Sequence, residues 1–236
     1  MISRFTARLI FAPFAKIHLL HPQRSSQSGA FILAANHISH FDPPLVSIAA
    51  RRKLDWMAMA ELFENRIFAA WARAIDIFPT DRFKVDRASV KTALTRLNLN
   101  HSVAIFPEGG IRDGARSVLQ GAPMLSGIAA IAHLANAPII PCVILGSDRL
   151  YNLKALSPFR RVKIHIGFAA PLQLDPSLEK SAARKKLEAD LGDSLRALLK
   201  EMYTHFNLME EDLPQSPGRR KGREQPDHPH KTPIAP

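Results

Sequence analysis

Short apolar runs alternate with longer amphipathic segments along most of this chain. Compact apolar runs of this kind predict buried strands, which we expect over residues 31–35, 55–60, 74–79, 102–106, 138–145 and 162–168. Apolar residues at helical spacing predict helices in between: one that starts near Asp42, and others over residues 61–73, 85–99, 124–136 and 177–203. This alternation predicts an α/β fold in which a mostly parallel central sheet is flanked by helices.

The two ends of the chain differ from this pattern. Residues 1–24 carry basic side chains and no acidic one, and their apolar positions recur at helical spacing. The longest uncharged stretch there, residues 9–15, is far too short to cross a bilayer, which takes about 20 residues. We expect an amphipathic helix that lies in a membrane interface, with an ordinary helix packed on the domain as the alternative. Residues 25–206 then form the folded domain, and the polar, proline-rich residues 207–236 a disordered tail.

Composition adds a class of partner. Among 236 residues, 32 are Lys or Arg and 21 are Asp or Glu, so the net charge of +11 points to an anionic partner. Nucleic acid, an anionic membrane and a phosphorylated substrate all fit this charge. One cysteine excludes an internal disulfide, and its apolar neighbours indicate that Cys142 is a small buried hydrophobe and not a nucleophile.

Three polar clusters directly follow predicted strands. They are residues 37–42, Asp81 with Arg82, and residues 108–110. Ligands of parallel α/β sheets collect beyond the carboxyl ends of the strands, so we expect the three clusters to share one site.

The first cluster has the composition of a general base and its partner. His37 and Asp42 lie in a turn between a strand and a helix, and the two prolines after Asp42 mark the helix start. A carboxylate on one imidazole nitrogen fixes the tautomer and leaves the other nitrogen as a base. The alternative is a surface histidine beside an aspartate that only caps the helix.

Four blocks in order carry a resemblance to a known family. They are Asn36-His37 with Asp42 five residues after the histidine, residues 77–82 ending in Arg82, residues 106–109 (Phe-Pro-Glu-Gly), and residues 138–141 (Pro-Ile-Ile-Pro). Over about residues 30–170 the chain resembles the glycerolipid acyltransferases, whose bacterial members include 1-acyl-sn-glycerol-3-phosphate acyltransferase. The resemblance implies transfer of a fatty acyl group from acyl-CoA or acyl carrier protein to a lysophospholipid hydroxyl. A thioester is already activated, so we expect no metal or cofactor. Because the acceptor lipid resides in a bilayer and the N-terminal segment is basic and amphipathic, we expect a peripheral protein on the cytoplasmic face of the membrane.

The resemblance also implies roles for individual residues. His37 is the general base and Asp42 orients it, while Arg82, Glu108, Gly109, Gly110 and Arg112 bind the acceptor. The third block departs from the family's Phe-Pro-Glu-Gly-Thr-Arg, because Gly110 replaces the threonine and the arginine is displaced by one residue to Arg112.

Three points stay open. The donors for the oxyanion are backbone N–H groups near Gly109 and Gly110 or at the helix start near Asp42. The altered third block leaves room for another acceptor, such as a lyso-aminolipid. A hypothesis from another functional class is that the chain is a basic protein without catalytic activity that binds membranes or nucleic acid, although no nucleic-acid-binding motif is present.

Overall fold

The computed structural model describes residues 2–59, 64, 78–80, 87–125, 127–152, 161–209 and 212–215. The α-helices and strands are, in chain order, α1 (Ile2–Phe11), β1 (Ala15–Leu20), β2 (Ile32–Ala35), α2 (Asp42–Ala49), β3 (Leu54–Met59), β4 (Phe78–Thr80), α4 (Arg87–Asn98), β5 (Ser102–Ile105), α5 (Ile128–Ala135), β6 (Ile139–Leu145), β7 (Val162–Phe168) and α6 (Lys180–Phe206). Short 3-10 turns are η1 (Pro22–Ser26), η3 (Gly114–Arg116), η4 (Val118–Gln120) and η5 (Ser147–Tyr151).

Seven strands form one sheet in the order β1-β7-β6-β2-β5-β3-β4. Every neighbouring pair is parallel except β6 with β7, which is antiparallel. The prediction of an α/β fold with a mostly parallel central sheet is therefore confirmed. The central strand β2 has no exposed residue, as expected for a strand covered on both faces.

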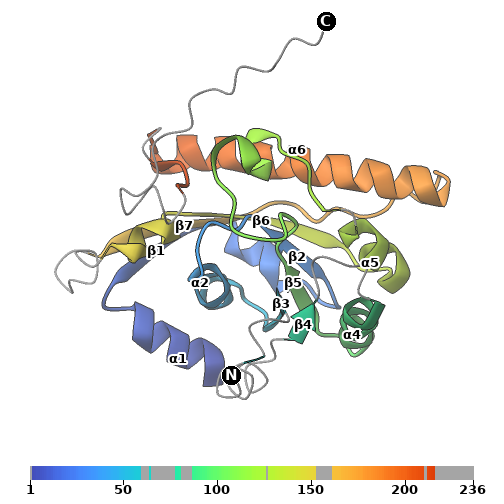
Figure 1. The fold of residues 1–236 in the computed structure, drawn as a ribbon, viewed down its shortest axis with the longest axis horizontal. Helices are drawn as coiled ribbons and strands as arrows, with labels where there is room; N and C mark the ends of the chain where they lie inside the picture. Colours follow the sequence, from blue (N-terminus) through green and yellow to red (C-terminus); the bar gives the residue numbers. More distant parts are fainter. Residues whose placement is uncertain are drawn as a thin grey trace, which may run out of the picture.

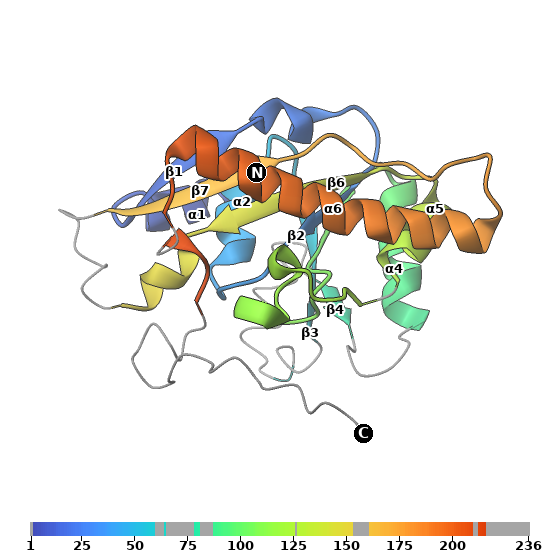
Figure 2. The ribbon, with the colours of Figure 1, turned by 90° about the horizontal axis from the view of Figure 1, so that it is seen from above.

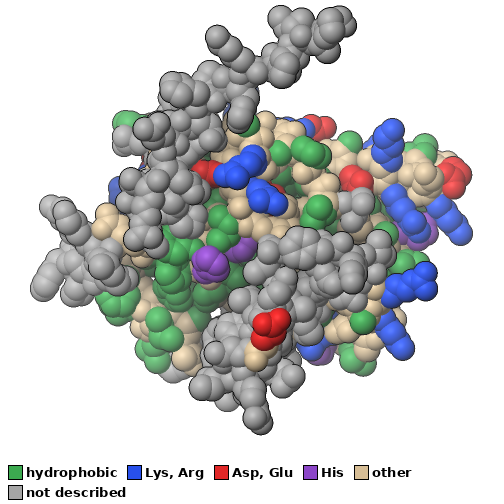
Figure 3. Space-filling view, viewed as in Figure 1, with side chains coloured by type: hydrophobic (Ala, Val, Ile, Leu, Met, Phe, Trp, Pro, Cys, Tyr) green, Lys and Arg blue, Asp and Glu red, His purple; other side chains and the backbone are tan. Residues whose placement is uncertain are grey.

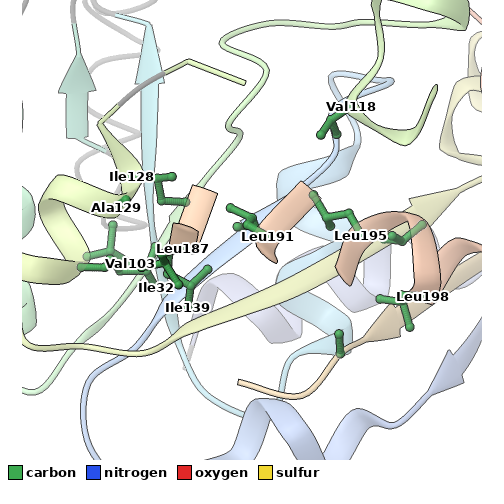
Figure 4. Close-up of a cluster of buried hydrophobic side chains, with 14 of the residues drawn as sticks. Ile32, Val103, Val118, Ile128, Ala129, Ile139, Leu187, Leu191, Leu195 and Leu198 are labelled. Carbon is green, nitrogen blue, oxygen red and sulfur yellow. The ribbon is translucent and has the colours of Figure 1, made fainter. Parts of the chain in front are cut away.

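Helices cover both faces of the sheet, with α6 on one side and α1 and α2 on the other (Figure 1). Seen from above, α6 runs across the sheet over β6 and β7 (Figure 2). Leucines of α6 point toward apolar side chains of the strands, such as Ile32 and Ile139 (Figure 4). A second apolar cluster fills the opposite side, where α2 packs on the sheet through Leu45 and Val46. The two clusters hold the central strands in place from both sides.

The first strand was not predicted. Residues 15–20, which we expected to belong to an interfacial segment, form β1 and pair with β7 from Ala15↔Val162 to Leu20↔Gly167. The partner lies far away in the sequence, so no local pattern announces the pairing. The predicted domain start at residue 25 was therefore wrong, because the sheet already includes residue 15.

The C-terminal boundary also differs from the prediction. Helix α6 ends at Phe206. Its C-cap residue Asn207 has a left-handed φ of 52°, and Leu208 packs on the core. Gln215 donates its N–H to Asp148, so residues 212–215 are bonded to the domain and a tail that begins at residue 207 is excluded. Residues 216–236 lie outside the described part of the chain, as do the predicted helix over residues 61–73, apart from Glu64, and residues 74–77. Among the described helices, none combines the length and the apolar character that a bilayer span requires.

Candidate active site

The predicted site residues gather where three central strands end. His37 and Asp42 follow β2, and Glu108 follows β5. Ser147, which the sequence analysis did not single out, follows β6, and β2 pairs with both β5 and β6. Figure 3 shows histidine side chains beside a hydrophobic area on one face of the molecule. Two of the three polar clusters predicted to meet do so, whereas Asp81 and Arg82 lie outside the described residues.

His37 and Asp42 form a hydrogen-bonded pair. Nδ1 of His37 lies 2.9 Å from Oδ2 of Asp42, and the aspartate is fully buried while the histidine side chain is 15% exposed. Because a carboxylate only accepts hydrogen bonds, Nδ1 carries the hydrogen and Nε2 of the neutral ring keeps its lone pair. This is the arrangement of a general base with an orienting partner.

Asp42 is held by the turn that precedes it and is not the helix cap. The N-cap position belongs to Phe41, and Asp42 is the first residue of α2. Its Oδ2 accepts the N–H groups of Ile38 at 2.7 Å and Ser39 at 2.8 Å, and its Oδ1 accepts the hydroxyl of Ser147 at 2.5 Å. The two prolines that follow have no N–H to leave unpaired, so α2 begins without a side-chain cap. The carboxylate therefore points back toward His37.

Aromatic stacking sets the plane of the imidazole. The ring of His37 stacks on Phe106 with centroids 3.9 Å apart and planes 11° apart, and Phe106 stacks on Trp56 at 4.8 Å. Trp56 is itself fixed, because its indole N–H donates to Ser47 Oγ at 2.8 Å. Stacking and the Asp42 bond together leave His37 little rotational freedom.

The side chain of Asn36 anchors the start of the His37–Asp42 turn to the neighbouring strand β6. Its side-chain amide donates to the carbonyl of Ile144 at 3.0 Å and accepts the N–H of Ile144 at 2.8 Å. These two bonds continue the β2–β6 ladder past the last residue of β2. The buried asparagine was seen in the first block, but only the neighbouring strand reveals its part in the structure.

The side chain of Glu108 is buried and bonds to the protein backbone, which the sequence did not predict. Its side chain is only 6% exposed; Oε2 accepts the N–H of His37 at 2.7 Å, and Oε1 accepts the Ser117 hydroxyl and the Val118 N–H, both at 2.8 Å. Burial raises the pKa of this carboxyl group, and the donors from His37, Ser117 and Val118 oppose that rise. Both carboxylate oxygens accept hydrogen bonds from groups of the protein itself. We therefore assign Glu108 to positioning His37 and not to direct contact with an acceptor.

The glycines and Arg112 border the same turn. Gly109 has a φ of +66°, and a Cβ at this position would collide with the side chain of Leu125. Arg112 donates its backbone N–H to the carbonyl of His37 at 2.9 Å, while its side chain is exposed. The segment after Gly109 thus runs alongside His37.

Every backbone N–H group of the turn from His37 to Asp42, which we call the catalytic turn, already donates a hydrogen bond within the protein. The N–H groups of residues 37–42 bond to Glu108, Asp42, Tyr151 or Ser39, and positions 43 and 44 are prolines. Gly109 donates to the carbonyl of Phe106 at 3.0 Å. Of the two sources of oxyanion donors left open by the sequence, the helix start is therefore occupied, and the segment that begins at Gly110 is favoured.

His40 and Cys142 lie near this site but have other surroundings than His37. His40 is exposed, and both its N–H and its Nδ1 contact the hydroxyl of Tyr151. Cys142 is fully buried, and burial raises the pKa of its thiol, which agrees with a small hydrophobe in the core. No group of three or more His, Cys, Asp or Glu suited to a metal ion occurs within the described ranges.

The sequence of this chain is similar to those of known proteins. A sequence model of the family described as Acyltransferase matches residues 16–145. A 1-acyl-sn-glycerol-3-phosphate acyltransferase of Bacillus subtilis is 28% identical over 185 residues, which are 76% of this chain and 84% of that protein. A protein of the same name from Streptococcus pneumoniae is 26% identical over 192 residues, 80% of this chain; the match spans 64% of that relative's length, slightly less than two thirds.

A solved structure has the same fold. The 1-acyl-sn-glycerophosphate acyltransferase PlsC from Thermotoga maritima superposes with a TM-score of 0.62 at 18% sequence identity, covering 84% of this chain and 78% of that one. At this identity the likeness concerns the fold.

Proposed function

This chain belongs to the acyltransferase family, and from that premise we propose that it transfers a fatty acyl group to the free hydroxyl of 1-acyl-sn-glycerol-3-phosphate, which gives phosphatidic acid. The names of the two bacterial relatives support this acceptor. The observation that carries the chemistry is the 2.9 Å bond from His37 to the buried Asp42 at the end of the central strand.

In the proposed reaction, His37 removes the proton of the acceptor hydroxyl. An alcohol is a weak nucleophile at neutral pH, and a base at its proton typically contributes 10²- to 10⁴-fold. The oxygen attacks the thioester carbonyl, a C–O bond forms, and the C–S bond breaks with release of the thiol, which takes the proton from His37. Asp42 stabilises the imidazolium between these steps, and we assign the N–H of Gly110 to the tetrahedral oxyanion.

The acceptor's phosphate calls for cationic side chains near the catalytic pair. Arg112 is exposed and its backbone adjoins His37, so we assign it, with Arg82, to the phosphate. Gly110 offers backbone and no side chain to the glycerol end. The acyl donor is acyl-CoA or acyl carrier protein, and both carry the activated thioester.

The N-terminal helix supports a peripheral position on a membrane. Phe11 and Phe14 pack partly on the core, whereas Leu9 and Ile10 are 60% and 57% exposed. Next to them is a groove whose lining includes the apolar residues Phe11 and Ile17. The basic residues Arg8, Lys16 and Arg161 also line this groove. Exposed aliphatic side chains beside cations are typical of a helix that lies on an anionic membrane.

An acyl-transfer assay tests the activity. The full chain is given lysophosphatidate with acyl-CoA or with acyl-loaded carrier protein, and the same assay is run with a lyso-aminolipid. We expect phosphatidic acid from the wild type and at least a hundredfold lower kcat from a folded His37→Ala variant. Product from the lyso-aminolipid alone would refute the acceptor, and a His37→Ala variant with more than a tenth of the wild-type rate would refute the base.

A vesicle sedimentation assay tests the membrane contact. Leu9→Ser with Ile10→Ser should weaken binding to anionic vesicles, and high salt should release only part of the wild type, because salt screens the charges and not the apolar contact. Leu134→Ser is the matched control, since Leu134 is 59% exposed on α5. Equal binding of both variants would place the contact on another surface.

A further inference from the structure

The turn η5 bonds to the catalytic pair on one side. Ser147, its first residue, is fully buried and donates its hydroxyl to Oδ1 of Asp42 at 2.5 Å. Tyr151, its last residue, accepts the N–H of His40 at 2.9 Å, and its ring lies 5.3 Å from that of Phe41. Both ends of this turn therefore touch the segment between His37 and Asp42.

The middle of η5 bonds to residues 212–215, which we call the C-terminal strap. Arg149 Nη2 donates to Asp212 Oδ1 at 2.5 Å, and the N–H of Gln215 donates to Asp148 Oδ2 at 3.1 Å. Asp212 is braced in turn, because its Oδ2 accepts the N–H of Met209 at 2.9 Å. The strap thus holds the residues that lie between the two contacts with the catalytic turn.

The backbone fixes η5 from a third direction. Gly146, which precedes it, has a φ of +87°, and a Cβ there would collide with the backbone carbonyl oxygen of Lys163. The glycine lets β6 end in a sharp turn directly against β7. Ser147 consequently has a defined place beyond the end of β6, next to the end of β2.

We propose that Ser147 is a positioning residue for the reaction proposed above, and that the C-terminal strap acts through it. Oδ2 of Asp42 is held by two backbone N–H groups and the imidazole, and Ser147 supplies the bond to the other oxygen. A carboxylate bonded at both oxygens cannot turn away from His37. Through its bonds to Arg149 and Asp148, the strap keeps the Ser147 hydroxyl at hydrogen-bond distance from Asp42. This inference rests on the proposed acyl transfer.

Ser147→Ala tests the first part. The variant should lower kcat about tenfold to a hundredfold, as expected for a lost bond to a charged group, and leave KM for donor and acceptor unchanged. Ser25→Ala is the matched control, because Ser25 is also fully buried and donates its hydroxyl at 2.7 Å, to the carbonyl of Pro22. The control should lose stability and keep kcat.

Asp212→Asn tests the strap. It should lower kcat about twofold to fivefold with KM unchanged, in keeping with a partly exposed ion pair. In the double variant with Ser147→Ala the strap substitution should have no further effect, because the path to Asp42 is already broken. Asp193→Asn, which breaks an exposed Arg–Asp pair on α6, is the control and should be silent.

Three kinetic results would overturn the proposal: a Ser147→Ala variant with wild-type kcat, a rise in KM that accounts for its whole effect, or strictly additive losses in the double variant. Imidazole ¹H–¹⁵N spectra give a reading that does not depend on turnover. The Nδ1–H signal of His37 should be present in the wild type and broadened or shifted in Ser147→Ala. If the wild type transfers no acyl group, the proposed function fails; an unchanged signal in Ser147→Ala refutes the positioning role.

Discussion

Replacing Asp42 by asparagine removes one charge from the site and keeps the size of the side chain. The surroundings decide how the new amide is oriented. Ile38 and Ser39 both donate N–H groups to Oδ2, so the amide oxygen takes this place and the NH₂ group faces Ser147. His37 keeps an oxygen acceptor at Nδ1, and its tautomer is unchanged. The substitution thus isolates the effect of the charge.

The size of that effect follows from the geometry. When His37 takes the proton of the acceptor, an imidazolium forms with its Nδ1 2.9 Å from the carboxylate oxygen. Charge centres about 4 Å apart attract by about 4 kcal/mol at an effective dielectric constant of about 20. The amide dipole replaces part of this attraction, so we expect kcat to fall about a hundredfold to a thousandfold.

Steady-state kinetics with lysophosphatidate measure this loss. Asp42→Ala removes the acceptor as well as the charge and should lose more than Asp42→Asn. Asp55→Asn is the control, because Asp55 is also buried but bonds to Arg96 and His101 near the start of β3. It should lower the free energy of unfolding and leave kcat within about twofold, a small effect on the barrier. The reasoning is refuted if Asp42→Asn keeps more than a tenth of wild-type kcat, or if it equals Asp42→Ala.

Three further predictions concern acceptor binding, stability and pH. Arg82→Ala should raise KM for lysophosphatidate about tenfold to a hundredfold and spare KM for the acyl donor; an equal rise for both would make Arg82 structural. Glu108→Gln should lower the free energy of unfolding by about 1–3 kcal/mol in chemical denaturation, because the amide NH₂ then faces the N–H of His37; unchanged stability would contradict the role assigned to Glu108. Burial and the neighbouring His18 lower the pKa of His165 to about 4, so the unfolded chain takes up a proton first as the pH falls. The loss of folding free energy that His165 causes should therefore be absent above about pH 6.5 and grow as the pH falls to about 4. In His165→Gln, the free energy of unfolding should change less with pH over this range.

Much of the site could be predicted from the sequence because it is local. The apolar run before Asn36 predicts a buried strand, the prolines after Asp42 predict a helix start, and a turn between them brings His37 and Asp42 together. These features lie within residues 31–44, and their geometry depends on neighbours along the chain. The alternation of strands and helices is local in the same sense, and it determined the fold class.

The tertiary structure alone decided which distant segments complete the site. Ser147 lies 105 residues beyond Asp42 and reaches it only because β6 pairs with β2. Glu108 was predicted to bind the acceptor, but the donors of His37, Ser117 and Val118 surround its carboxylate and turn it inward. The direction of a buried side chain is set by the partners that the fold supplies, and those partners come from other elements of the sheet.

The same reason explains the errors at the two ends. Residues 15–20 have no strand signal of their own and become β1 because β7 offers an open edge. The strap is polar and short, so its composition suggested disorder, yet Arg149 and Asp148 give its Asp212 and Gln215 specific partners. Strand pairing and ion pairs between remote segments depend on the closed fold, and sequence periodicity carries no record of them.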